Sequence, residues 1–314
     1  MLVIASRHPF QKTFVWPGKR EKIAELVVRC ASMSSFPRMP VQHAERWEDQ
    51  LTEARPKLVT FGISHFCEKA RWALDWHGIR YDEIGWPPGL HIVLTKRCGA
   101  KATTLPIVLD GERVIQGSGA IIDWADQRTQ DRARTLTVAD ALEIEQRADS
   151  VIGVHARRLA YAEMLPRSPH LAKPALFSNT SRSHRLIGNM MWPVSRRVMM
   201  RVYDITPDAA SESRAKLDAE LSWLDSMLAD GRTYLAGDRF SRADITVAGL
   251  LAPFARPKEM PTYHNMPVPD ALVADSERWR DRPVMRWVIA RYQTHRVPRS
   301  EAPQPAAGHD LMQT

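Results

Sequence analysis

Cysteine is scarce in this chain. Its 314 residues include only Cys30, Cys67 and Cys98. Three cysteines are too few for the disulfide framework that stabilises small secreted proteins, and their odd number leaves at least one thiol unpaired. The cysteine content therefore favours a reducing compartment, and we expect a cytoplasmic protein.

Long apolar runs are also missing. No window reaches the roughly 18 uninterrupted apolar residues that predict a membrane-spanning helix. The most apolar late stretch, residues 245–254, is short and contains Pro253. The first four residues are apolar, but no positive segment precedes them and no small-residue cleavage site follows, which argues against a secretory signal. We therefore expect a soluble protein with no membrane partner.

The sequence has no concentrated basic patch, although its formal net charge is +8. Residues 1–57 contain ten Lys and Arg and six Asp and Glu, a net charge of +4, so the other +4 is spread over residues 58–314. No basic run is interleaved with aromatic residues in the manner of a single-strand binding groove. The dispersed positive charge is typical of a solvated protein surface, and we expect no nucleic-acid partner.

The remaining composition is that of a globular protein, with 44% apolar and 25% charged residues, and the length allows two cores. Residues 1–54 have no clean pattern and are expected to form an N-terminal extension without stable structure. Strand and helix signals alternate over residues 55–130, and only helical signals follow over residues 137–297. The Pro- and Ala-rich residues 298–314 are expected to be a disordered tail.

The stretch LVTFGISHFCEKARWALDW, residues 58–76, is the clearest strand-to-helix transition in the chain. It begins with β-prone residues, and after a polar turn the apolar period changes from 2 to 3.6 near Phe66. Arg71 and Asp75 lie four residues apart and are predicted to form an ion pair. Gly78 is placed to end the helix as a left-handed cap. We expect a buried strand, a tight turn and a helix.

Two side chains suited to thiol chemistry flank the start of that helix, Ser64 and Cys67. The free N–H groups and the dipole of a helix N-terminus favour an anion such as a thiolate. Cys67 is either the working thiol or a small packed residue. Ser64 is either a contact to a thiol or a plain helix cap.

Further elements complete the first domain. Residues 106–109 and 113–116 are predicted strands, and Asp110-Gly111 is the hairpin signal between them. Ser118 is predicted to cap the following helix. Because a helix joins the first two strands, they should be parallel, and the hairpin adds antiparallel pairing. We predict a mixed four-stranded sheet whose other elements are a strand at residues 80–84 and a weak helix at residues 90–97.

Helical signals alone follow Thr137. The strongest is FSRADITVAGLLAPFA, in which Ser241 is the predicted N-cap and Asp244 occupies the third helical position. Pro166 to Pro174 is predicted to be a break. The expected helices cover residues 138–165, with Gly153 as a weak point, and residues 182–204, 209–229, 269–279 and 283–295.

Three motifs, in this order and spacing, resemble the glutathione transferase superfamily over residues 56–296. SHFCEKARWAL is similar to the active-site turn and first helix, S/C-P-F-x-x-K/R-x-R. TTLPIVLDGERVIQGSGAI resembles the segment with the cis-proline and the glutathione-binding serine, and FSRADITVAG resembles the core helix cap of the second domain. The resemblance implies an α/β thioredoxin-like domain with a mixed four-stranded sheet, then an all-α helical bundle domain, and a homodimer.

The resemblance also implies a site for glutathione as a co-substrate, without a metal. Ser64 would donate a hydrogen bond to the glutathione sulfur. Leu105, before a cis Pro106, would pair with the cysteinyl backbone. Ser118, at a helix start, would hold the γ-glutamyl carboxylate. The implied activity is attack of the glutathione thiolate on a small apolar electrophile.

Two departures from the family pattern keep alternatives open. His65 replaces the usual proline and can be a general base or a pH-sensitive contact. Gly117 stands where an acidic residue normally pairs with the glutathione amine, and the neighbouring Gln116 is the remaining candidate. The alternatives are glutathione-dependent deglutathionylation through Cys67 and a non-catalytic binding or scaffold protein.

The substrate pocket is expected in the helical domain. Its Met and Trp residues either line an apolar pocket or pack in the core. The candidates are Tyr161, Met190, Met191 and Trp192.

Overall fold

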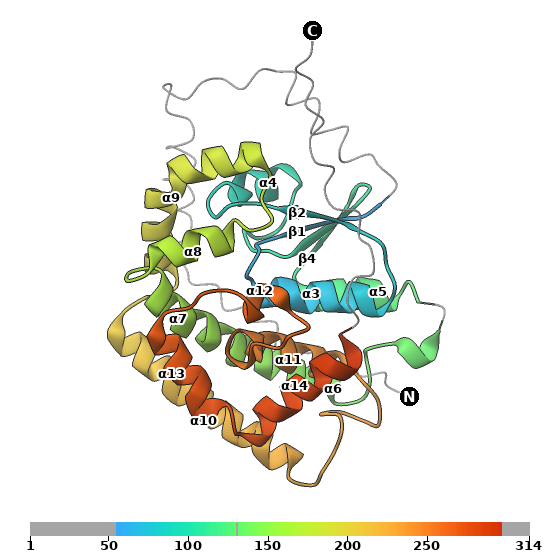
Figure 1. The fold of residues 1–314 in the computed structure, drawn as a ribbon. Helices are drawn as coiled ribbons and strands as arrows, with labels where there is room; N and C mark the ends of the chain where they lie inside the picture. Colours follow the sequence, from blue (N-terminus) through green and yellow to red (C-terminus); the bar gives the residue numbers. More distant parts are fainter. Residues whose placement is uncertain (1–54, 130, 297–314) are drawn as a thin grey trace, which may run out of the picture. The chain divides into compact units, whose positions relative to one another are not determined.

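The computed structural model describes residues 55–129 and 131–296 (Figure 1). The predicted extension and tail, residues 1–54 and 298–314, lie outside the described residues. None of the described helices is both long enough and apolar enough to cross a membrane.

The first described elements form a four-stranded mixed sheet in the order β2-β1-β3-β4. β1 pairs with β2 in parallel and with β3 antiparallel, so Val59 lies beside both Ile84 and Ile107. β3 and β4 form the hairpin, in which Ile107 pairs with Gln116. The predicted thioredoxin-like sheet is confirmed. Its strands are β1 (Lys57–Thr60), β2 (Asp82–Gly85), β3 (Ile107–Asp110) and β4 (Arg113–Gln116).

Helices α3 (His65–Trp76) and α5 (Ser118–Asp126) pack together against the sheet, and α4 (His91–Arg97) follows β2 (Figure 1). The strand residues divide between two cores because neighbouring side chains point to opposite faces of a sheet. Leu58 packs with residues of α3 and α5. Val59 packs with Cys67 and Leu105 and with the partly buried Leu94 of α4.

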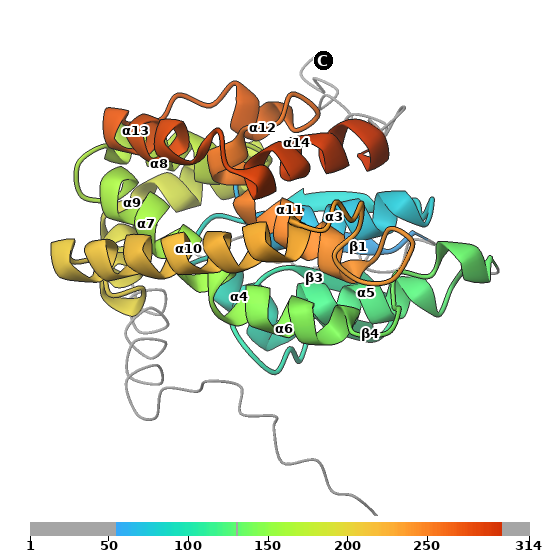
Figure 2. The same ribbon diagram turned by 90° about the horizontal axis from the view of Figure 1, so that it is seen from below.

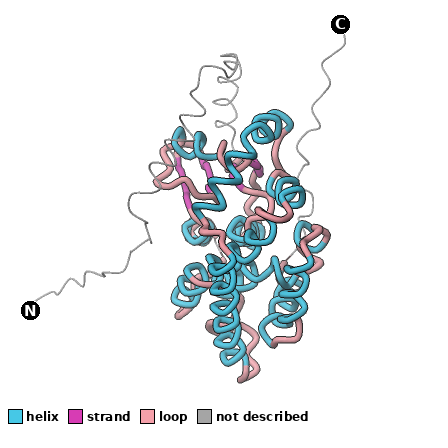
Figure 3. The backbone as a smooth tube through the Cα atoms, turned by 90° about the vertical axis from the view of Figure 1, so that its left-hand side faces the viewer, coloured by secondary structure: helices cyan, strands magenta, loops and turns pink. Residues whose placement is uncertain are grey.

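Helices form the rest of the described chain, as predicted, and Figure 3 shows the strands gathered in one layer beside them. α11 lies at the centre and contacts α3, α6, α7, α13 and α14 (Figure 2). The helices are α6 (Ala141–Ser150), α7 (Ile152–Met164), α8 (Pro169–Leu176), α9 (Arg182–Val202), α10 (Pro207–Leu228), α11 (Arg242–Ala255), α12 (Pro261–His264), α13 (Asp270–Trp279) and α14 (Pro283–His295), with a 3-10 turn at Arg132–Arg134.

The start of α11 has the predicted cap. The Asp244 carboxylate accepts hydrogen bonds from the backbone N–H groups of Ser241 and Leu235, both at 2.8 Å. Asp244 is fully buried. Because buried backbone donors need partners, this carboxylate fixes both the helix and the preceding loop.

Several local predictions were wrong in ways that tertiary contacts explain. Arg71 does not pair with Asp75, because it turns to Glu83 and Glu68 while Asp75 pairs with Arg296 at 2.7 Å. Gly117, not Ser118, is the N-cap of α5, since Ser118 is already helical.

Other differences concern element boundaries. The predicted break at residues 166–174 contains most of α8, whose first residue is Pro169, a position where proline's missing N–H costs nothing. The predicted helix at residues 138–165 is two helices that meet at Val151. Helix α12 was not predicted, and the hairpin turn is centred on Gly111-Glu112, because Asp110 is still paired.

Candidate active site

The sheet brings the predicted contacts together at one edge. The end of β1, the start of β3 and the end of β4 meet there, because Val59 pairs with Ile107 and Ile107 with Gln116. The predicted contact residues Ser64, Leu105, Pro106, Gly117 and Ser118 follow or precede these strand ends.

The segment before β3 offers a free backbone edge. The Leu105–Pro106 peptide is cis, as predicted. The Pro106 carbonyl accepts a hydrogen bond from the Gly117 N–H at 3.0 Å, which joins this segment to the start of α5. Among the described residues, no hydrogen-bond partner faces the N–H or C=O of Leu105. These two groups are available to an extended ligand backbone.

Gln116 holds the loop that leads to this edge. Its side-chain nitrogen donates to the carbonyls of Ala102 and Thr104 at 2.6 and 2.9 Å, and its oxygen accepts from the Ala102 N–H at 2.9 Å. Its amide is therefore occupied in shaping the loop. Gly117 has φ of +98°, a conformation that favours glycine.

Helix α5 starts at the same edge with Ser118, whose side chain is largely buried. The N–H groups of its first turn have no intrahelical partner, so the helix start suits a carboxylate.

Ser64 is the N-cap of α3. Its hydroxyl oxygen accepts a hydrogen bond from the Cys67 N–H at 3.4 Å. A hydroxyl that accepts one bond still has its proton to donate. Ser64 is half-buried, so this proton can serve a ligand while the oxygen caps the helix.

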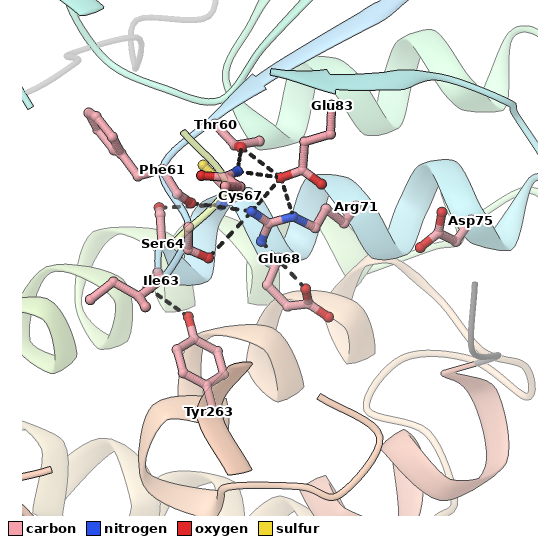
Figure 4. Close-up of polar contacts among 12 residues, drawn as sticks. Thr60, Phe61, Ile63, Ser64, Cys67, Glu68, Arg71, Asp75, Glu83 and Tyr263 are labelled. Atoms are coloured by element: carbon pink, nitrogen blue, oxygen red, sulfur yellow. Dashed lines mark hydrogen bonds and ion pairs between the residues drawn. The ribbon is translucent and has the colours of Figure 1, made fainter. Parts of the chain in front are cut away.

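Arg71 fixes the backbone of the loop that carries Ser64 (Figure 4). Its guanidinium donates to the carbonyls of Phe61 and Gly62 at 3.2 and 3.4 Å and to the Glu83 carboxylate at 2.7 Å. Asn179, from the segment between α8 and α9, donates to the same carboxylate at 2.9 Å. Arg71 therefore holds the loop directly and links it, through Glu83, to β2 and to the segment between α8 and α9.

Tyr263, in α12, is a further support that the sequence did not reveal. Its hydroxyl donates to the Ile63 carbonyl at 2.9 Å, and its side chain is almost fully buried (Figure 4). This contact fixes the backbone position of Ile63, the residue before Ser64. No sequence signal points to it, because α12 is only four residues long.

His65, a candidate general base in the sequence, is buried. Its Nε2 lies 3.1 Å from the Gly153 carbonyl, and since a carbonyl only accepts, Nε2 carries the proton. Burial, with the nearby charge of Arg157, lowers the pKa of His65 to about 3. A neutral imidazole of such low basicity ties α3 to α7 and is a poor general base at neutral pH.

Cys67 is fully buried beneath the same turn. Burial raises the pKa of its thiol. A nucleophilic cysteine needs a depressed pKa and access to its substrate, so the geometry favours the packed-residue reading of Cys67.

Ser64 and His65 also line a cavity of about 40 Å³ between the turn and the second domain. Of the predicted pocket residues, only Tyr161 lines it, whereas Met190 is exposed and Trp192 lies in the core. The other lining residues are Ile63, Arg157, Ala160, Met164, Pro253, Phe254, Tyr263, Met266, Val268 and Leu272. Within the described residues, no group of three or more His, Cys, Asp or Glu is arranged to hold a metal ion.

Comparisons with known proteins match both parts of the chain. The glutathione S-transferase N-terminal domain model matches residues 58–133, and the C-terminal domain model matches residues 207–288. The two matches together span half of the chain. A comparison with curated proteins gives no match.

Solved structures share the fold. A glutathione S-transferase of Ceriporiopsis subvermispora, in complex with glutathione, has 18% identity and a TM-score of 0.51 over 79% of this chain and 100% of its own. A glutathione transferase of Phanerochaete chrysosporium has 15% identity and a TM-score of 0.51 over 76% and 96% of the two chains. At these identities the likeness concerns the fold.

Proposed function

The chain belongs to the glutathione S-transferase superfamily, and we propose that it uses Ser64 to activate the thiol of glutathione for attack on a small apolar electrophile. The observation that carries the proposal is the sheet edge where the Ser64 hydroxyl, the unpaired backbone of Leu105 and the start of α5 meet. The glutathione bound by the Ceriporiopsis subvermispora relative supports the choice of thiol.

Each group at this edge suits one part of glutathione. The Leu105 N–H and C=O would pair with the cysteinyl backbone, beside the cis Pro106. The first turn of α5, with Ser118, would hold the γ-glutamyl carboxylate, because free N–H groups and the helix dipole stabilise an anion. Gly117 supplies no side chain to the glutathione amine, so binding depends on the remaining contacts.

The reaction then follows from the charge that must be stabilised. The thiol proton leaves to solvent, and the thiolate accepts a hydrogen bond from the Ser64 hydroxyl at the N-terminus of α3. The hydrogen bond and the helix N-terminus would both lower the pKa of the bound thiol. The thiolate sulfur attacks an electrophilic carbon and forms a C–S bond, while the leaving group departs with its electron pair. We further propose that the protein is a cytoplasmic homodimer. The reaction described above does not depend on its location or on its oligomeric state.

The Ser64→Ala substitution tests the role of the hydroxyl. We expect kcat/KM with a generic aryl halide to fall by about 100-fold, because one positioned donor to a developing or formed anion contributes on that order. The control is Cys67→Ala, which should keep activity since its thiol is buried.

Two outcomes would contradict parts of the proposal. Full activity in Ser64→Ala would remove Ser64 as the activating residue, and loss in Cys67→Ala alone would favour deglutathionylation. Calorimetric titration of the wild type with millimolar glutathione tests the site itself. If glutathione did not bind, the result would favour the alternative of a non-catalytic binding or scaffold protein.

A further inference from the structure

Arg157 of α7 is a half-buried cation for which the described residues supply no anion. Within the described residues it forms no hydrogen bond and no ion pair, and its Nε is buried without a partner. Its guanidinium carbon lies 4.5 Å from the ring centre of Tyr203 and 5.8 Å from that of Phe66. The two rings hold the planar group in place by cation–π contact, without using its hydrogen-bond donors.

The same residue lines the cavity beside Ser64 and His65. It is the only charged residue among those that line the cavity, and no lining residue is acidic. His65, which also lines the cavity, cannot balance this charge, because an imidazole is either neutral or positively charged; its pKa of about 3 makes it neutral at neutral pH. A cation with five N–H donors therefore faces a small space whose other walls are mostly apolar.

Leaving a guanidinium with a buried, unpartnered Nε is costly, so a ligand that supplies the counter-charge would be favoured at this position. A guanidinium matches a carboxylate through two parallel hydrogen bonds. We propose that Arg157 binds the carboxylate of the electrophile, so that the substrates of this site are small electrophiles that carry one carboxylate on a short apolar skeleton.

The proposal rests on the glutathione transferase reaction proposed above and narrows its second substrate. With chloroacetate as a representative, the thiolate sulfur would form a bond to the methylene carbon and the C–Cl bond would break, releasing chloride. The carboxylate stays intact throughout, and its role is to place the methylene carbon against the sulfur at Ser64.

The test compares chloroacetate with chloroacetamide, a neutral molecule of nearly the same shape, at saturating glutathione. The readout is the ratio of the two kcat/KM values, each corrected for the uncatalysed reaction. The full-length protein is compared with Arg157→Met, Arg157→Lys and Arg158→Met. Arg158→Met is the matched control, because it removes the same charge one residue away. The native Arg158 side chain donates to the Tyr203 carbonyl at 3.1 Å.

We expect Arg157→Met to lower the carboxylate-to-amide ratio by about 10-fold or more, the usual effect of removing a charge-assisted hydrogen bond. Arg157→Lys should keep part of the preference for the carboxylate, because lysine retains the positive charge but lacks the two parallel N–H donors of the guanidinium. Arg158→Met should leave the ratio unchanged. Thermal melting of each variant separates folding defects from specificity.

Three results would overturn the inference. An unchanged ratio in Arg157→Met would show that the guanidinium does not contact the carboxylate. An equal loss with both electrophiles would make Arg157 a stabiliser of the thiolate. A raised KM for glutathione with both electrophiles would assign Arg157 to glutathione instead.

A binding measurement separates this inference from the proposed function. The ligands are the two products, S-(carboxymethyl)glutathione and S-(carbamoylmethyl)glutathione, titrated into the wild type. Tighter binding of the carboxylate product supports the role of Arg157. Equal binding of both overturns that role alone, whereas binding of neither overturns the glutathione site and with it the proposed function.

Discussion

At the scale of single residues, the roles of this site depend on which side chains are withdrawn from solvent. His65 and Cys67 are both chemically versatile, and both are buried and held in their neutral forms. Ser64 directly precedes His65 in the sequence and is half-buried with a free hydroxyl proton. Burial thus selects the serine from three neighbouring candidates.

The low pKa of His65 gives the protein a defined weakness in acid. As the pH falls below 6.5, the unfolded chain takes up a proton at this imidazole and the folded chain does not until about pH 3. The free energy of unfolding therefore falls over this window and is unaffected above it. We expect His65→Gln to lose about 2 kcal/mol less stability than the wild type between pH 7 and pH 5.

Urea unfolding at the two pH values measures this difference. The exposed His170, replaced by Gln, serves as the control. Parallel pH dependence in wild type and His65→Gln would mean that the folded imidazole is protonated in the normal range.

At the scale of elements, α7 approaches α3 as closely as it does because residue 153 is glycine. A Cβ on Gly153 would lie 2.4 Å from the ring of Phe66, closer than real contacts permit. Gly249 in α11 also faces α3, but a Cβ there would lie 3.6 Å from the Lys69 nitrogen, an ordinary contact. The sequence marked Gly153 as a weak point of a helix, and the structure gives its reason.

The two glycines form a matched pair for substitution. We expect Gly153→Ala to lower the free energy of unfolding by about 1–3 kcal/mol, because Phe66 must move. Gly249→Ala should be neutral or raise it by about 0.5–1 kcal/mol, since alanine favours a helix and has room. Urea denaturation of both variants measures the contrast, and equal effects would refute the packing argument.

Local elements were predictable where their cause is local. The hairpin, the cis Pro106 and the cap at Asp244 depend on residues close in sequence or on a motif. The contacts that hold the active-site turn could not be predicted, because Arg71 contacts Glu83, 12 residues away in the sequence, and Tyr263 contacts Ile63, 200 residues away. Spacing rules describe one helix face at a time and carry no information on such partners.

At the scale of the whole described chain, a buried ionic cluster joins the sheet domain to the helical domain. Lys69 of α3 lies 2.6 Å from Glu145 and 2.8 Å from Asp149, both in α6. Arg242 of α11 also contacts Glu145 and lies 2.6 Å from Asp123 of α5. Lys69 is fully buried. The charges of Lys69, Glu145 and Arg242 thus compensate one another away from water, and the cluster reaches the surface at Asp149 and Asp123.

Removing one partner should therefore cost more than the net value of the pair. We expect Lys69→Met to lower the free energy of unfolding by about 3 kcal/mol, because it removes one of the two cations that compensate the buried Glu145 and the cation paired with Asp149. Urea unfolding followed by near- and far-ultraviolet circular dichroism should still show one coincident transition. Lys216→Met breaks the exposed pair with Glu212 and should change nothing measurable. Equal effects would show that the buried cluster has no structural importance.

The contacts of Arg296 have a consequence for how the protein is made. Its guanidinium meets Glu68 of α3 at 2.9 Å across 228 residues, and the adjacent His295 carbonyl accepts a hydrogen bond from Trp72. A ribosome releases the chain from its N-terminus, so the helix that begins beside Ser64 emerges while the 228 residues that separate Glu68 from Arg296 are still to be made. Until Arg296 and His295 are made, the Glu68 carboxylate and the Trp72 indole N–H of the nascent sheet domain lack these partners and depend on water.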